Sequence, residues 1–194
     1  TDASWIANGT KLAFLREGEI WTMDANGENR KKLSDTEGAI EGYKFSPDGK
    51  KVILLKSLDY HGTIKKNPSD LPLATGRLVT DMNYRHWDHY VEQISHAFVA
   101  DVTENGIANV VDILKGEPYE CPLAPFGGIE QLDWSIDSKL VAYTCRKKEG
   151  VDYAISTDAD IYIYNVETKR TRNLCKPEGY KEPKIDATKS MKNQ

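Results

Sequence analysis

Apolar and polar positions alternate in short runs along this chain, and turn-forming residues separate the runs. Residues 43–56, YKFSPDGKKVILLK, contain an alternating run, the turn Ser-Pro-Asp-Gly and a second, mostly apolar run. Pro47 fixes its φ at a value that suits the first corner of a turn. Asp48 can hydrogen-bond to the backbone that follows it, and Gly49 can adopt a positive φ. The pattern predicts two antiparallel strands joined by a tight turn.

This unit occurs two more times in the sequence. Residues 5–14 have Asn-Gly at the turn, and residues 132–143 keep Ser, Asp and Lys but lack the Pro and the Gly. Each copy has an aromatic residue before the turn and an apolar run after it. Asp48 follows Asn8 by 40 positions, and Asp137 follows Asp48 by 89 positions. A fixed period with one long insertion is typical of a repeat architecture.

The first repeat indicates how many strands one unit contains. Strands are expected at 11–16 and 19–24, followed by an Asn-Gly turn and a short basic strand at 29–33. Charges on that last strand suit an exposed edge, because they discourage pairing with another sheet. Four strands per ~40 residues are typical of a β-propeller blade. We therefore expect an all-β fold, a partial β-propeller of about three four-stranded blades.

The repeats also suggest boundaries. We expect a propeller segment at 1–175, with blades at about 1–38, 39–116 and 117–175, and a polar, lysine-rich linker or tail at 176–194. An insertion at 59–95 interrupts the second blade, and its aromatic content argues against disorder. In the third blade, residues 146–160 form a longer middle turn. Three blades do not close a propeller, which typically needs ~4–8, so we expect a part of a larger one.

Composition narrows the class of protein. The chain has 194 residues, of which 39% are hydrophobic, and a net charge of −4. The length allows a real core, and the negative charge argues against a general nucleic-acid surface. No apolar run approaches ~18 residues, so no membrane span is expected. The sequence shows no signal peptide at Thr1 and no initiator Met, so we expect a processed protein or a cloned piece.

The sequence offers little for a metal site or a cofactor, and none is expected. Cys121, Cys145 and Cys175 fit no zinc spacing, and buried thiols are favoured over one disulfide with one thiol left over. His86 and His89 are three residues apart, without a third ligand of recognisable spacing.

A catalytic triad is also absent from the pattern. The chain contains no G-x-S-x-G, and no alternation of strands and helices that could form an α/β-hydrolase domain. Ser95, His96 and Asp101 are the residue types of a triad, but they lie along one expected strand. We therefore expect no catalytic residue, and no peptide hydrolysis by this chain alone.

Two segments around the insertion resemble a known family. Residues 84–88, YRHWD, followed by residues 96–102, HAFVADV, resemble the N-terminal propeller of serine peptidases of the prolyl oligopeptidase family. The resemblance is to the branch of dipeptidyl peptidases and acylaminoacyl peptidases. The SPDGK turn and the Ile-Trp-x-Met-Asp strand resemble the propeller repeat of TolB-type proteins. Ile136 and Ser138 depart from the usual Pro and Gly, which weakens that turn but not the architecture.

The resemblance implies a non-catalytic role for this chain. Such enzymes carry a separate C-terminal α/β-hydrolase domain, and the propeller gates substrate access and contacts the amino end of the peptide. Peptide substrate and that domain are thus the implied partners, and a periplasmic or secreted location is implied. TolB-like periplasmic protein binding and carbohydrate binding, with Trp87 and Tyr90 as sugar platforms, are the alternative functions.

The insertion supplies the candidate substrate-binding residues: Arg85, Trp87, Asp88, Tyr90 and Glu92. In the dipeptidyl branch, acidic side chains on a propeller insertion hold the substrate's ammonium, which points to Asp88 and Glu92. Trp87 and Tyr90 could line a subsite, and Arg85 could hold a carbonyl or carboxylate. Structural roles are the alternatives for these residues: surface carboxylates, ion pairs and packing of the insertion.

Self-association is a further expectation, because a three-blade arc leaves two terminal faces bare. We assign to the terminal blades the following apolar residues: Trp5, Phe14, Ile20 and Trp21 in the first, and Trp134, Val141, Tyr143, Tyr162 and Tyr164 in the third.

Overall fold

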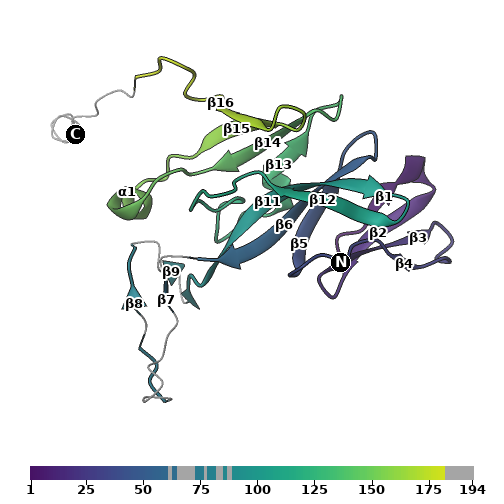
Figure 1. Cartoon of the computed structure of the whole chain (residues 1–194), viewed down its shortest axis with the longest axis horizontal. Helices are drawn as coiled ribbons and strands as arrows, with labels where there is room; N and C mark the ends of the chain where they lie inside the picture. Colours follow the sequence, from purple (N-terminus) through teal and green to yellow (C-terminus); the bar gives the residue numbers. More distant parts are fainter. Residues whose placement is uncertain (61–62, 65–72, 77, 82–84, 87–88, 182–194) are drawn as a thin grey trace, which may run out of the picture.

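Three four-stranded antiparallel sheets follow one another along the chain, each with its strands in sequence order (Figure 1). This computed structural model describes residues 1–60, 63–64, 73–76, 78–81, 85–86 and 89–181. Blade 1 consists of β1 (Ser4–Ile6), β2 (Lys11–Arg16), β3 (Glu19–Asp24) and β4 (Lys31–Lys32). Blade 2 consists of β5 (Ile40–Phe45), β6 (Lys51–Asp59), β11 (Gln93–Thr103) and β12 (Gly106–Asp112). Blade 3 consists of β13 (Leu132–Trp134), β14 (Leu140–Cys145), β15 (Asp160–Asn165) and β16 (Arg170–Asn173).

Short elements complete the described chain. Two small hairpins lie in the insertion of blade 2, β7 (Thr63–Ile64) with β8 (Leu78–Val79) and β9 (Arg85–His86) with β10 (His89–Tyr90). The helical elements are η1 (Ala7–Gly9), η2 (Ile129–Gln131) and α1 (Gly150–Ile155). The expected all-β, three-bladed partial propeller is confirmed. The six-residue helix α1 is a correction to the expected turn at 146–160.

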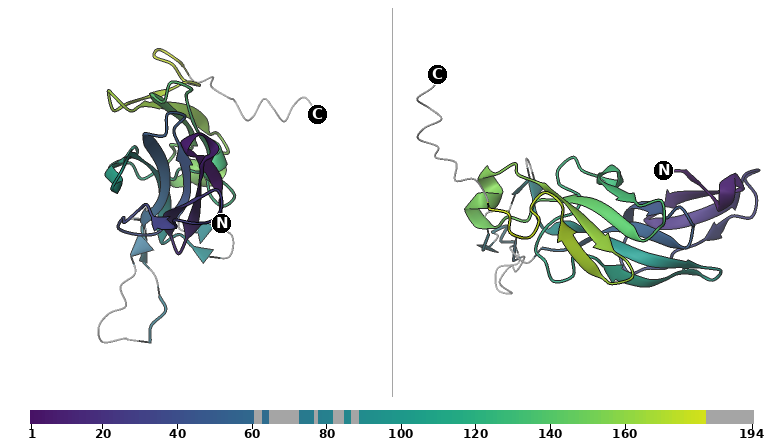
Figure 2. Two further views of the ribbon diagram at one scale, coloured as in Figure 1. Left: turned by 90° about the vertical axis from the view of Figure 1, so that its right-hand side faces the viewer. Right: turned by 90° about the horizontal axis from the view of Figure 1, so that it is seen from above.

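The blades pack face to face, which Figure 2 shows as successive layers along the long axis. Strand β6 reads as a continuous apolar run because both of its faces are buried. Val52 and Leu54 face the core shared with blade 1, while Ile53 and Leu55 face the core shared with blade 3. Side chains alternate across a strand, so one central sheet separates two cores.

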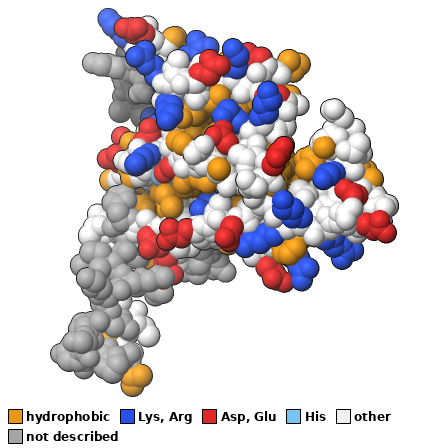
Figure 3. Space-filling view, turned by 45° about the vertical axis from the view of Figure 1, so that its right-hand side comes forward, with side chains coloured by type: hydrophobic (Ala, Val, Ile, Leu, Met, Phe, Trp, Pro, Cys, Tyr) orange, Lys and Arg blue, Asp and Glu red, His pale blue; other side chains and the backbone are white. Residues whose placement is uncertain are grey.

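The apolar residues of the terminal blades divide between inner and outer faces in a way that differs from the sequence-based expectation. Ile20 and five blade 3 residues expected on bare faces are at most 9% exposed: Trp134, Val141, Tyr143, Tyr162 and Tyr164. They face blade 2, because alternation alone does not tell which side of a strand meets a neighbour. The outer faces carry Trp5, which is 62% exposed as expected, and Ile161, which is 47% exposed and was not among the expected residues. Figure 3 shows hydrophobic side chains gathered on one face, surrounded by charges of both signs.

The turns that define the repeat use the same hydrogen bonds in blades 2 and 3. The Ser46 hydroxyl donates to the Asp48 carboxylate (2.7 Å) and accepts from the Lys51 amide (2.9 Å). In blade 3, the Ser135 hydroxyl likewise donates to the Asp137 carboxylate at 2.6 Å. These bonds hold each hairpin in the register that buries its apolar side chains.

Ser138 replaces the glycine of the repeat without breaking the turn. It adopts φ 60°, the left-handed conformation that Gly49 adopts with φ 69° in blade 2. Its hydroxyl accepts a hydrogen bond from the Asp48 amide at 3.1 Å, so it links the turns of neighbouring blades. The hydroxyl that departs from the repeat thus provides a contact between blades that glycine could not provide.

Candidate functional site

One end of the propeller collects the long connections between strands. In each up-and-down sheet, the connection between the second and third strands and the connection to the next blade leave from the same end. This end therefore carries the insertion after β6, the β14–β15 connection with α1, and the loop between β12 and η2. We call it the insertion face; Figures 1 and 2 show α1 beside the small hairpins of the insertion.

The insertion residues expected to bind substrate are only partly within the described structure. Trp87 and Asp88 lie outside the described residues, and for Arg85 the backbone alone is described, in β9 paired with Tyr90. Tyr90 is 39% exposed, and Glu92 is half-buried. The Glu92 carbonyl accepts the Tyr60 amide at 2.9 Å, which fixes the end of the insertion to the end of β6. Their roles in binding remain predictions.

Tyr60 anchors the base of the insertion. Its side chain is 3% exposed and packs with Val91 and Ile94 in a small apolar cluster of its own. The Tyr60 hydroxyl donates to the Asp81 carboxylate at 2.8 Å. A buried phenol with a satisfied hydroxyl holds both ends of the insertion close to the blade.

Glu41 is a further carboxylate at this face, and the sequence reasoning missed it. It lies on the innermost strand of blade 2, and its side chain is exposed. The Ser95 hydroxyl donates to one carboxylate oxygen at 2.8 Å, and the Ser57 hydroxyl donates to the other. Ser57 and Ser95 are directly paired across β6 and β11. Three strands therefore orient this carboxylate, a relation that only the register reveals.

The β14–β15 connection is fastened to the loop that precedes blade 3. The Tyr153 hydroxyl of α1 donates to the carboxylate of Glu120, whose residue is 2% exposed. Burial, and then the charge of Glu120, raise the pKa of Tyr153 above its usual value, so the phenol stays protonated and donates. The Arg146 guanidinium lies 4.1 Å from the centre of the Tyr153 ring, a cation–π contact.

Two further pairs support the same connection. The Tyr119 hydroxyl donates to the Glu149 carboxylate at 2.9 Å, and burial raises the pKa of Tyr119 to about 12. The Lys147 ammonium lies 2.5 Å from the Glu117 carboxylate. These contacts fix the backbone of the connection, whereas Val151 and Ile155 on α1 are 60% and 75% exposed. The insertion face therefore presents exposed apolar side chains on a connection whose backbone is fixed by these contacts.

Ser95, His96 and Asp101 do not lie together as a catalytic triad. Ser95 bonds to Glu41, whereas His96 is 2% exposed and its Nδ1 lies 3.0 Å from the Asp112 carboxylate. Asp101 lies at the opposite end of blade 2 and bonds to the Lys51 ammonium at 2.6 Å. Each of the three side chains is hydrogen-bonded to a different partner, which accounts for its position without a catalytic role.

The described cysteines form no disulfide, and two of the three are held in the thiol form by burial. Cys121 and Cys145 are buried thiols, Cys175 is an exposed one, and none is in a disulfide. Burial raises the pKa of Cys145 to about 12 and that of Cys121 well above its usual value, so both stay protonated. Within the described ranges, no group of three His, Cys, Asp or Glu residues is placed to hold a metal ion. No described helix is long and apolar enough to cross a membrane.

Comparisons with known proteins find similarity to a part of longer proteins. No protein-family model matches it. Dipeptidyl-peptidase 5 of Porphyromonas gingivalis is 45% identical over 175 residues, which are 88% of this chain and 26% of that protein. The chain is similar to a segment of dipeptidyl peptidases. Dipeptidyl-peptidase 5 of Porphyromonas endodontalis is 36% identical over 174 residues, 88% of this chain and 25% of that protein. The chain thus spans about a quarter of the length of these relatives.

A solved structure agrees at the level of the fold. Acylaminoacyl peptidase from Pyrococcus horikoshii superposes with a TM-score of 0.54 at 14% identity. The match covers 89% of this chain and 25% of that chain. The resemblance to the propeller of the dipeptidyl and acylaminoacyl peptidase branch is confirmed.

Proposed function

We propose that this chain is the non-catalytic propeller part of a serine peptidase of the prolyl oligopeptidase family, of the dipeptidyl or acylaminoacyl type. The similarity to one quarter of dipeptidyl-peptidase 5 carries this proposal. In the whole protein, an α/β-hydrolase domain supplies the Ser, His and Asp of the reaction. The protein acts on peptides and is periplasmic or secreted.

The insertion face is the side that meets the substrate. Its connections form a rim that admits short peptides to the active site, and its carboxylates hold the amino end. Glu92 and Asp88 are the insertion's candidates, with Arg85, Trp87 and Tyr90 beside them in the sequence. Glu41 is the candidate added by the structure, because two serine hydroxyls already orient its exposed carboxylate.

The chemical basis is a charge-assisted hydrogen bond. A carboxylate that faces a free amine gains such a bond, whereas an acetylated amine leaves the carboxylate without a partner. The loss is about 1.5–3 kcal/mol for one such bond, or roughly ten- to a hundredfold in kcat/KM. Preference for a free over a blocked amino end is therefore the signature of this role in a parent of the dipeptidyl type.

A chimera tests the proposal. This chain replaces the matching quarter of Porphyromonas gingivalis dipeptidyl-peptidase 5, and kcat/KM is measured for a dipeptidyl reporter with a free amine and for its N-acetylated form. Glu92→Gln or Glu41→Gln is expected to reduce the ratio of the two kcat/KM values. Glu28→Gln, an exposed glutamate on the β3–β4 turn, is the matched control and leaves the ratio unchanged. An unchanged ratio in both test variants would reject these carboxylates as the amine contact.

A further inference from the structure

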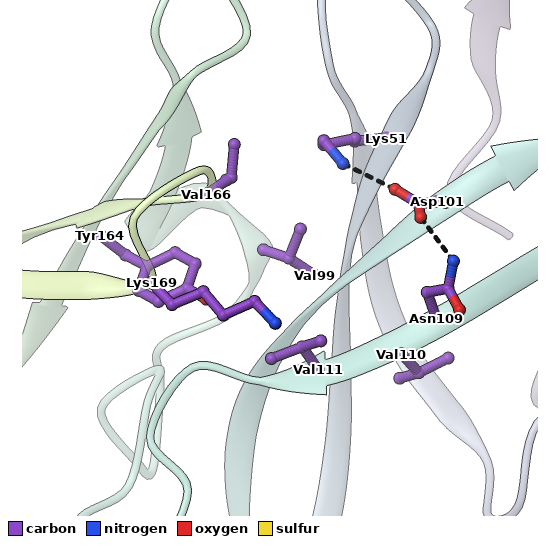
Figure 4. A pocket seen from close by; sticks show the side chains of 9 residues that line it. All are labelled: Lys51, Val99, Asp101, Asn109, Val110, Val111, Tyr164, Val166 and Lys169. Carbon is purple, nitrogen blue, oxygen red and sulfur yellow. Dashed lines mark hydrogen bonds and ion pairs between the residues drawn. The ribbon is translucent and has the colours of Figure 1, made fainter.

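A pocket lies at the end of the sheets opposite the insertion face. It occupies the crevice between the outer strands of blades 2 and 3 and has a volume of about 400 Å³ (Figure 4). β6, β11 and β12 form one wall, and β15 with the β15–β16 turn forms the other. Both walls come from described residues. The proposed peptidase function does not use it.

The polar residues of one wall satisfy one another. The Lys51 ammonium lies 2.6 Å from one oxygen of the Asp101 carboxylate, and the Asn109 amide donates to the other oxygen at 2.8 Å. Asn109 has φ 52°, opposite the register shift between Val99 and Asp101 that bends this edge of the sheet. The cluster is an internally paired unit that shapes the wall and carries no excess charge.

Lys169 contributes the charge that remains. It lies at the β15–β16 turn with φ 56°, and Figure 4 shows its side chain reaching across the pocket beside Tyr164 toward Val99 and Val111. Its ammonium forms no hydrogen bond or ion pair with any residue that the structure describes. With Lys51 and Asp101 cancelling, the pocket holds one positive charge in excess.

The rest of the lining is apolar. Val99 and Tyr164 are 6% and 5% exposed, and Val111 and Val166 lie beside them at the pocket. A pocket of a few hundred Å³ that combines apolar side chains with a small number of placed polar groups has the usual composition of a small-ligand site. The charge selects an anion, and the valines and the tyrosine ring select a compact hydrocarbon body.

We propose that this pocket binds a monocarboxylate with a short, branched apolar body. The carboxylate pairs with the Lys169 ammonium, and the body packs against Val99, Val111 and Tyr164. Two sources share this chemistry: a free branched carboxylic acid, and the C-terminal carboxylate of a peptide that ends in a branched aliphatic residue. This pocket is separate from the insertion face. If it binds no carboxylate, the proposed peptidase role is therefore unaffected.

Nuclear magnetic resonance of the isotope-labelled full chain tests the proposal with three probes: isovalerate, N-acetylvaline and N-acetylvalinamide. Both carboxylates are expected to shift the amide signals of Asn109, Val111 and Lys169, while the neutral amide is not. Tighter binding of isovalerate points to a free acid as the source, and tighter binding of N-acetylvaline points to a peptide terminus. Lys169→Met is expected to weaken carboxylate binding about tenfold, as for one charge-assisted bond.

Lys11→Met is the matched control, because Lys11 is an exposed lysine of blade 1 that lies 3.9 Å from Asp24 and far from the pocket walls. It is expected to leave the affinity unchanged. Three results would each overturn the proposal: no binding of either carboxylate, equal binding of the neutral amide, or undiminished affinity of Lys169→Met. Lys169 is exposed at a turn, so its replacement is not expected to unfold the chain.

Discussion

Trp134→Phe tests whether the packing of blade 3 on blade 2 stabilises this chain. Trp134 is 9% exposed, and its indole N–H donates to the Lys44 carbonyl of blade 2 at 2.9 Å. In the same place, the Lys44 ammonium donates to the Leu132 carbonyl at 2.5 Å. The indole is thus both part of the shared core and one of the polar links between the two blades.

The expected cost follows from the two parts of this contact. Loss of the hydrogen bond costs about 1–1.5 kcal/mol. The smaller ring leaves unfilled volume in a core that cannot fully collapse, which adds roughly 1 kcal/mol or more. Together they lower the free energy of unfolding by about 2–3 kcal/mol. Trp5→Phe is the matched control, because Trp5 is 62% exposed, and its cost is expected to stay within about 0.5 kcal/mol.

Urea unfolding, followed by far-ultraviolet circular dichroism at one fixed protein concentration, measures both variants. Circular dichroism is preferable to fluorescence because each variant removes a tryptophan. The midpoint of Trp134→Phe should fall well below that of Trp5→Phe, with little change in the slope. Equal midpoints for the two variants would refute the account of how blades 2 and 3 pack.

Three other predictions concern pH, activity and association. The hydrogen bonds from Lys51 and then Asn109 hold the pKa of Asp101 below its usual value. The ionised Asp101 therefore stabilises the folded chain above about pH 4, and this stabilisation is lost as the pH falls through the lower pKa of the folded state. Urea unfolding should therefore show Asp101→Asn to be destabilising at pH 6 and less so at pH 3, and a pH-independent difference would count against the ion pair. The isolated chain should not hydrolyse dipeptidyl or acyl-aminoacyl reporters, and hydrolysis blocked by a fluorophosphonate would reveal a missed nucleophile. Bare outer faces with Trp5 and Ile161 should make the chain self-associate in light scattering across a concentration series, and a strictly monomeric species that binds no dye for apolar surface would contradict this.

Much of the fold could be predicted because strand and turn signals in this chain are local. The strands KLAFLR and EIWTMD appear where the alternation places them, as β2 and β3. The SPDG turn depends on bonds among neighbouring residues, such as that between Ser46 and Asp48. The blade and tail boundaries proposed from the repeat stay predictions.

The features that escaped prediction depend on contacts between distant residues. Helix α1 has only six residues, and its Tyr153 is held by Glu120, which is 33 positions away. Such a helix is too short to be stable through its own propensity. The Glu41 carboxylate is oriented by a hydrogen bond from Ser95, which is 54 positions away and is brought close by the strand register. The sequence alone does not show which distant residues lie side by side, so it gives no signal for either arrangement.

Catalytic turnover by the chimera with Porphyromonas gingivalis dipeptidyl-peptidase 5 tests the central claim most directly. If this chain is the propeller part of such a peptidase, the chimera should fold, react with a fluorophosphonate at its nucleophile and hydrolyse a free-amine dipeptidyl reporter. A folded chimera whose nucleophile reacts with the fluorophosphonate but which does not turn over that reporter would contradict the claim.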